Sequence, residues 1–233
     1  MSDRSTTPLL GRGIYTVPEA ARLGRIPPAS IRRWLRGYYF TKDGAKVFSE
    51  KVIRGELPII DDTLALSFLD LLEARCLHAF RARGVGWRTL REAHGKAREA
   101  MDTDHPFSTG QFKTVGRRVM RDFATENGDP MLLDIVRQQP AFREFLRPYL
   151  RGLDFLPGAQ FPARWFPLDG TKRVVIDPAR AFGHPIVSER GVLTSILARA
   201  YAAEGSYDKV ARWYEVDVRS VKDAVEYEHA LAA

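Results

Sequence analysis

Residues 16–37 read TVPEAARLGRIPPASIRRWLRG, a pattern typical of two short helices joined by a tight turn. Thr16 and Glu19 have the spacing of a capping box, in which each side chain accepts a hydrogen bond from a backbone amide at the start of a helix. Gly24 allows the chain to turn. The Pro27-Pro28 dipeptide suits the first turn of a second helix, where a missing amide costs little. The stretch therefore predicts a helix-turn-helix.

The second predicted helix has an apolar side and a basic side. Ile31 and Leu35 lie four residues apart and are expected to face inward, with Trp34 beside them. The remaining surface carries three arginines, Arg32, Arg33 and Arg36. A helix with such a face is expected to enter the major groove of DNA. The alternative is that the two helices only contribute to a core and that the arginines form a solvated face.

The distribution of charge favours the DNA-binding interpretation. Residues 1–100 contain 18 Lys and Arg and 11 Asp and Glu, whereas residues 101–233 contain 18 of each. The whole basic excess therefore lies in the half with the predicted helix-turn-helix, as expected if this half contacts phosphate groups.

The segment YYFTKDGAKVF, residues 38–48, directly follows the two predicted helices. Asp43-Gly44 favours a tight hairpin turn, and a hairpin at this place is a wing. Lys42 and Lys46 are expected to reach phosphates, and Tyr38 or Tyr39 to hydrogen-bond to the DNA backbone. Alternatively, the tyrosines attach the hairpin to Trp34. The predicted DNA-binding residues are Ser30, Arg32, Arg33, Arg36, Tyr38, Lys42 and Lys46.

Two longer helices are predicted next, over SFLDLLEARCLHAFRARG (67–84) and WRTLREAHGKAREAM (87–101). The order of helix-turn-helix, hairpin and two helices resembles the DNA-binding domain of MerR-type regulators. The resemblance covers about residues 14–100, through TVPEAARL, IRRWLR and the two longer helices. It implies a winged helix-turn-helix domain at 14–102, after a flexible arm at 1–13.

Residues 103–178 are predicted to form a small mixed β domain with one helix. FSTGQFK, RRVMRDF and MLLDIV are interpreted as strands, and Pro140 is expected to open a helix over AFREFLRPYL. GLDF, QFPARWF and KRVVIDP are interpreted as further strands separated by Pro, Gly and Asp. The predicted fold class is α+β, mostly α.

Residues 179–233 are predicted to form three helices, with Ser206 and Asp217 as the caps of the second and third. When the chain is shifted by 190 residues, Arg22 falls on Arg212 and Ile31 on Val221 without gaps. The sequence therefore predicts a second helix-turn-helix-like unit at the C-terminus.

The expected outer face of this second unit is acidic. Arg33 corresponds to Asp223 and Arg36 to Glu226, and residues 181–233 contain 6 Lys and Arg against 8 Asp and Glu. Because acidic side chains repel phosphates, we expect this unit to bind a protein. A second DNA site is the alternative.

The C-terminal segment also resembles a small bacterial domain that occurs in antitoxins. The matching patterns are DP…FG.P, GV.T and EGS…VA..YEV, over about residues 174–230. Together with the MerR-like N-terminal half, they resemble a long VapB-type antitoxin. The resemblance implies a homodimer that represses its own operon from a palindromic operator and neutralises a PIN-like ribonuclease toxin encoded beside it. The expected partner-binding residues are Arg190, Trp213, Tyr214, Asp223 and Glu226, with Arg190 entering the acidic metal site of the toxin.

Catalysis is not predicted. The 5 histidines show no metal-ligand spacing with one another or with Cys76, and no serine lies in a nucleophile-elbow context, so no metal or cofactor is expected. The single cysteine and the lack of a membrane-length apolar run or signal peptide predict a cytoplasmic protein. The alternative function is a stand-alone MerR-like regulator that holds a small molecule near Trp165 and Phe166.

Overall fold

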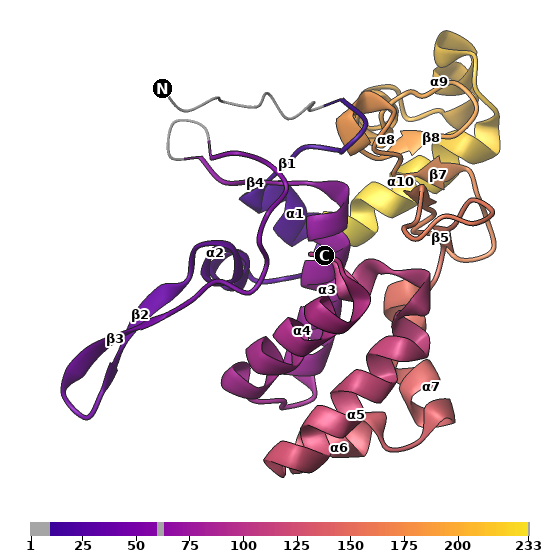
Figure 1. Cartoon of the computed structure of the whole chain (residues 1–233). Coiled ribbons are helices and arrows are strands. Elements are labelled where there is room, and N and C mark those ends of the chain that lie inside the picture. Colours follow the sequence, from indigo (N-terminus) through magenta and orange to yellow (C-terminus); the bar gives the residue numbers. More distant parts are fainter. Residues whose placement is uncertain (1–9, 60–62, 233) are drawn as a thin grey trace, which may run out of the picture.

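A computed structural model describes residues 10–59 and 63–232, which form mostly α-helices with four short antiparallel strand pairs (Figure 1). The α-helices are α1 (Val17–Gly24), α2 (Pro28–Arg36), α3 (Phe68–Ala82), α4 (Trp87–Met101), α5 (Val115–Asn127), α6 (Pro130–Val136), α7 (Gln139–Leu150), α8 (Thr194–Glu204), α9 (Tyr207–Tyr214) and α10 (Val218–Ala232). The 3-10 turns are η1 (Pro106–Ser108), η2 (Gly110–Lys113) and η3 (Ala181–Gly183). The strand pairs are β1 (Tyr15–Thr16) with β4 (Ala65–Leu66), β2 (Tyr38–Lys42) with β3 (Ala45–Ser49), β5 (Leu153–Asp154) with β6 (Arg164–Trp165), and β7 (Val174–Val175) with β8 (Ile186–Val187).

The predicted helix-turn-helix is present as α1 and α2. Thr16 and Glu19 form the expected capping box, and Thr16 Oγ1 accepts from the amide of Glu19 at 3.4 Å. The turn differs from the prediction in one detail, because Arg25 and not Gly24 has the left-handed backbone, with φ 53°. Ser67 and Asp70 form a capping box of the same kind at the start of α3.

The predicted strands between residues 105 and 136 are wrong, because this region is helical. FSTGQFK falls on η1 and η2, RRVMRDF on α5 and MLLDIV on α6. Gly116, which lies between the first two predicted strands, is in the first turn of α5. A Cβ atom there would lie 2.7 Å from Cε2 of Phe112, so glycine lets this ring pack onto the helix.

The boundary between α5 and α6 explains the rest of this error. Gly128 ends α5 in the left-handed conformation, Asp129 Oδ1 accepts from the amide of Leu132 at 2.8 Å, and Pro130 occupies the first helical turn. Gly, Asp and Pro therefore form a helix stop followed by a helix start, and not a turn between strands. Helix α7 and the short strands β5, β6 and β7 agree with the prediction.

The central helices and the N-terminal half share one hydrophobic core. The ring of Phe80 on α3 lies 5.6 Å from that of Phe107 and 4.7 Å from that of Phe145 on α7, measured between centroids. Phe107 and Phe112 are 4.3 Å apart, and all these rings are buried. Burial of so much aromatic surface makes this cluster a main source of stability for the described chain.

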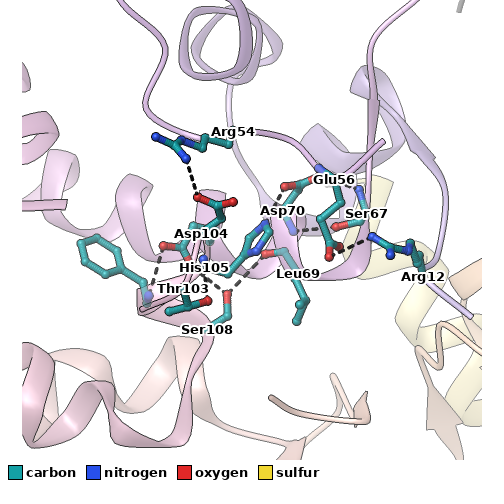
Figure 2. A network of polar contacts seen from close by, with 12 residues as sticks. Arg12, Arg54, Glu56, Ser67, Leu69, Asp70, Thr103, Asp104, His105 and Ser108 are labelled. Atoms are coloured by element: carbon teal, nitrogen blue, oxygen red, sulfur yellow. Dashed lines mark hydrogen bonds and ion pairs between the residues drawn. The ribbon is translucent and has the colours of Figure 1, made fainter. Parts of the chain in front are cut away.

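A buried polar network lies under the aromatic cluster, where α3 meets α4 and η1. The carboxylate of Glu73 lies 2.7 Å from Nε2 of His94 and accepts from the Ser108 hydroxyl at 2.8 Å. Asp70 lies 2.8 Å from Nε2 of His105, and Figure 2 shows this carboxylate between the helix cap and the imidazole. Burial alone lowers the pKa of His105, but the bond to Asp70 and the nearby carboxylates outweigh it, so the net shift is upward.

The start of the described chain is attached to the body of the protein. Of the predicted flexible arm at 1–13, residues 1–9 lie outside the described residues. Arg12 pairs with Glu56 at 3.3 Å, and its carbonyl accepts from the amide of Phe68 at 2.8 Å. Arg12, near the end of the predicted arm, therefore contacts both Glu56 and the start of α3.

The C-terminal helices rest on α1 and β1. The hydroxyl of Tyr15, which is fully buried, donates to the carbonyl of Gly183 at 2.8 Å. Arg22 on α1 pairs with Glu228 on α10 at 2.9 Å. Helix α8 packs mainly on α10, and the three helices α8–α10 have a small core of their own. The first and last helical units thus lie side by side (Figure 1).

Candidate nucleic-acid interface

Helix α2 is held by one buried face, which leaves its basic face exposed. The buried residues are Ile31, Trp34 and Leu35, and the exposed ones include Arg32, Arg33 and Arg36. The carbonyl of Trp34 accepts from the amides of Val52 and Ile53 at 2.9 and 3.1 Å. The Trp34 ring stacks on Trp87 of α4, with centroids 6.0 Å apart and planes at 14°. These contacts fix the orientation of the arginine face relative to the core.

The predicted hairpin is present as β2 and β3, which pair in register from Tyr38–Ser49 to Lys42–Ala45. Asp43 and Gly44 both have positive φ, 51° and 79°, as a type I′ turn requires. The hairpin projects from the body next to α2 (Figure 1). Lys42 and Lys46 lie close to its turn in the sequence, and both are exposed.

Aromatic rings support the basic side chains of the hairpin. The ammonium group of Lys46 lies 4.5 Å from the ring centroid of Tyr39, and this ring packs on Phe48 at 4.9 Å. The guanidinium of Arg33 lies 5.3 Å from the ring centroid of Tyr38, so α2 and the hairpin share a contact. The seven predicted DNA-binding residues therefore lie on one helix and the hairpin beside it.

One basic residue of this surface is missing from the sequence-based prediction. Ser30, Arg33 and Tyr38 line a groove together with Arg81 from the last turn of α3. The Arg81 guanidinium donates to the carbonyl of Val85. Its position in the sequence gives no sign that it approaches α2, because only the fold brings α3 there.

The charge of this surface is mainly positive. Residues 25–49 contain six basic residues (Arg25, Arg32, Arg33, Arg36, Lys42, Lys46) and one acidic residue, Asp43 at the hairpin turn. Such a surface attracts a polyanion at long range.

The C-terminal helices α9 and α10 repeat the backbone of α1 and α2 at an offset of 190 residues. Helix α1 covers 17–24 and α9 covers 207–214. In both repeats the residue after the first helix has a left-handed backbone: φ is 53° at Arg25 and 52° at Glu215. In both, the next residue donates its amide hydrogen back to the helix, from Ile26 to the carbonyl of Ala21 at 2.9 Å and from Val216 to that of Ala211 at 3.0 Å. The structure therefore agrees with the internal repeat predicted from the sequence.

The predicted partner-binding residues differ in their surroundings. Trp213 is 59% exposed, Glu226 is exposed and Tyr214 is half-buried. Asp223 pairs with Arg173 at 3.2 Å and accepts from the Thr171 hydroxyl at 3.0 Å, so it links α10 to the segment before β7.

Arg190 is also engaged within the chain. Its guanidinium donates to the carbonyl of Glu215 at 3.2 Å and pairs with the Glu215 carboxylate at 3.3 Å. This ion pair is exposed on both sides, so it contributes little stability and is easily exchanged for another carboxylate.

The chain is similar to a named antitoxin along nearly its whole length. It is 27% identical over 229 residues to the Mycobacterium tuberculosis protein named "Putative antitoxin VapB45", and the match covers 94% of each chain. It also resembles the crystal structure of Rv2018 from Mycobacterium tuberculosis, with a TM-score of 0.70 and 25% identity over 94% of this chain and 98% of the other. No family model matches the chain.

Other kinds of site are not found in the described chain. Residues 10–59 and 63–232 contain no group of three or more His, Cys, Asp or Glu side chains placed to hold a metal ion. Cys76 is buried, and burial raises the pKa of its thiol, which disfavours the reactive thiolate. None of the described helices is long and apolar enough to cross a membrane.

Proposed function

We propose that this protein is the antitoxin of a type II toxin–antitoxin system, which neutralises a PIN-like ribonuclease toxin and represses its own operon. The similarity to VapB45 carries this proposal, because it covers 94% of both chains. It therefore includes the basic N-terminal half and the acidic C-terminal unit together, and supports a toxin–antitoxin role for the whole chain.

Operator binding is assigned to α2 and the β2–β3 hairpin, acting as a MerR-like winged helix-turn-helix. Arg32, Arg33 and Arg36 enter the major groove with Ser30, while Lys42 and Lys46 contact phosphates and Tyr38 hydrogen-bonds to the backbone. A homodimer would present two such surfaces to a palindromic operator. The exposed arginine face and the excess of basic over acidic residues in 25–49 support this assignment.

Toxin binding is assigned to the C-terminal unit. Trp213, at 59% exposure, is a large aromatic side chain of the kind that anchors protein interfaces, and Tyr214 lies next to it on α9. Glu226 takes the place of Arg36 of the first repeat and disfavours DNA at this surface, while Asp223, at the place of Arg33, is paired with Arg173. Arg190 would exchange Glu215 for carboxylates at the toxin's metal-dependent site.

The first test is co-expression with the product of the adjacent gene, followed by size-exclusion chromatography. An antitoxin elutes as a complex with that product. If the two proteins elute separately, the proposed antitoxin function is refuted, and the alternative of a stand-alone ligand-responsive regulator is favoured.

A second test compares the contributions of the two helical repeats to DNA binding, in a gel-shift assay with the DNA upstream of the gene. Arg33→Glu removes one positive charge from α2 and adds a negative one. We expect a loss of affinity of about 5–150-fold, from ~1–3 kcal/mol for a direct contact. Lys222→Glu makes the same reversal at an exposed position of α10 and should leave the shift unchanged. Equal losses for both variants would contradict the division of roles between the repeats.

A further inference from the structure

A cavity of about 530 Å³ lies where the end of α1 meets α3, the end of α7, the segment around β6, and α10. Its volume is in the range of small-molecule sites. Its polar wall is formed by Arg25, Arg75, His78 and Tyr227, and its apolar wall includes Trp165 and Leu168. No acidic residue of the described chain lines this cavity.

Arg75 is a buried cation without an anionic partner in the described chain. Its residue exposure is 9%, and its guanidinium carbon lies 3.8 Å from the ring centroid of Trp165. It makes one long hydrogen bond, 3.4 Å, to the carbonyl of Tyr149, and no carboxylate of residues 10–59 or 63–232 lies within 4.0 Å. Burial lowers the pKa of Arg75 to about 10, so the group stays charged at neutral pH. A buried charge normally has a partner that offsets the cost of its desolvation.

Tyr227 contributes a second polar group that lacks a partner. Its side chain is on α10, the residue is 4% exposed, and its hydroxyl makes no hydrogen bond within the described chain. Burial raises the pKa of this hydroxyl, so it remains a neutral donor. An unpaired buried hydroxyl costs about 1–3 kcal/mol. The oxygen itself has almost no accessible surface, so an acceptor in the cavity recovers this cost after a shift of the side chains that cover it.

The guanidinium of Arg75 and the hydroxyl of Tyr227 indicate which kind of ligand the cavity would bind. It must accept hydrogen bonds and carry negative charge, because Arg75 is a buried cation and no acidic side chain of the described chain lines the space. Arg25 is exposed and donates to the carbonyl of Ala230 at 3.0 Å, and burial lowers the pKa of His78, which favours its neutral form. One buried guanidinium balances one negative charge, which favours a carboxylate over a doubly charged phosphate. The apolar side chains that line the rest of the cavity would accommodate a flat or aliphatic part of the ligand next to Trp165.

We propose that this cavity binds a small organic carboxylate, held by Arg75 and Tyr227. The ligand would contact α1 and α10 together, so it would stabilise the junction between the two helical repeats. This site is independent of the toxin and DNA roles proposed above, and neither role is needed for it.

The test uses benzoate as the probe and the full chain as the protein. Thermal unfolding and calorimetric titration are measured with sodium benzoate, with its neutral counterpart benzamide, and with sodium chloride at equal ionic strength. We expect a saturable increase in the melting temperature with benzoate alone. An equal response to chloride would mean a non-specific ionic effect, and an equal response to benzamide would exclude charge recognition; either result overturns the proposal, as does no response to benzoate.

Two variants and a control variant test whether benzoate binds in this cavity. Tyr227→Phe removes only the unpaired hydroxyl, so it should fold at least as well as the original chain and bind benzoate at least about 10-fold more weakly. Arg75→Met should abolish binding. Arg219→Met removes an exposed arginine from the same helix as Tyr227 and should not change binding. Unchanged affinity in Tyr227→Phe overturns the proposal, and this variant decides the outcome if Arg75→Met does not fold.

Discussion

Replacement of Gly183 by alanine should loosen the attachment of the C-terminal unit to the N-terminal helices. Gly183 has φ +83°, and a Cβ atom there would lie 2.9 Å from Cζ of Tyr15 and closer still to its hydroxyl oxygen. Tyr15 is fully buried and cannot turn away without disturbing the core. The added methyl group therefore breaks the hydrogen bond from Tyr15 to the Gly183 carbonyl.

The expected loss can be obtained from two contributions. The left-handed conformation costs alanine roughly 1–2 kcal/mol, and a buried hydroxyl that loses its acceptor costs about 1–3 kcal/mol. A total loss of unfolding free energy of about 3 kcal/mol corresponds to a fall in melting temperature of about 6–12 °C for a chain of this size.

Differential scanning calorimetry of Gly183→Ala measures this loss, and Gly205→Ala is the matched control. Gly205 also has positive φ, +67°, but no atom lies within 4 Å of an added Cβ. The control should lose only about 1–2 kcal/mol, from backbone strain. In a Gly183→Ala background, Tyr15→Phe removes the closest clashing atom, so the double variant should lose less than the sum of the single losses. Equal losses at Gly183 and Gly205 would refute the close contact with Tyr15.

Three further outcomes are expected. The raised pKa of His105 means that the folded chain binds the imidazole proton more tightly than the unfolded chain does. The stabilisation by protonated His105 is therefore complete below about pH 6.5, the usual pKa of histidine, and is lost as the pH rises through the folded-state pKa. In urea unfolding, the difference in stability between the original chain and His105→Asn should narrow as the pH rises through the folded-state pKa. Lys42→Ala and Lys46→Ala should each reduce the salt slope of operator binding by about one, and an unchanged slope would place the hairpin away from phosphate. Glu228→Gln should cost about 1 kcal/mol of unfolding free energy, less at high salt, because its partner Arg22 is 47% exposed.

The candidate DNA surface was largely predictable because it is local in sequence. The caps and apolar spacing of 16–37 fix α1 and α2, and Asp43-Gly44 fixes the hairpin turn. Arg81 could not be predicted in the same way, because it reaches the groove only through the docking of α3. For Asp223 the sequence predicts an exposed acidic contact, but the fold pairs it with Arg173, 50 residues away.

The central region shows why short apolar runs mislead. Met120, Phe123 and Ala124 are buried residues of α5 with helical spacing, but the run RRVMRDF is too short to show this spacing because it ends before Ala124. Their helical state is stabilised by burial against the aromatic cluster around Phe80, which lies more than 30 residues earlier. Tertiary contacts therefore decided between helix and strand where the local pattern was ambiguous.

The sequence by itself determined the helix-turn-helix, its exposed arginines, the hairpin and the acidic second repeat, because caps, turns and the order of charges act over a few residues. Only the tertiary structure decided which distant groups meet. It placed Arg75 and Tyr227, 152 positions apart in the sequence, in one cavity, and it seated the C-terminal unit on Tyr15 and Arg22. Such juxtapositions depend on how helices from the whole chain pack around shared apolar surface, which no local pattern contains.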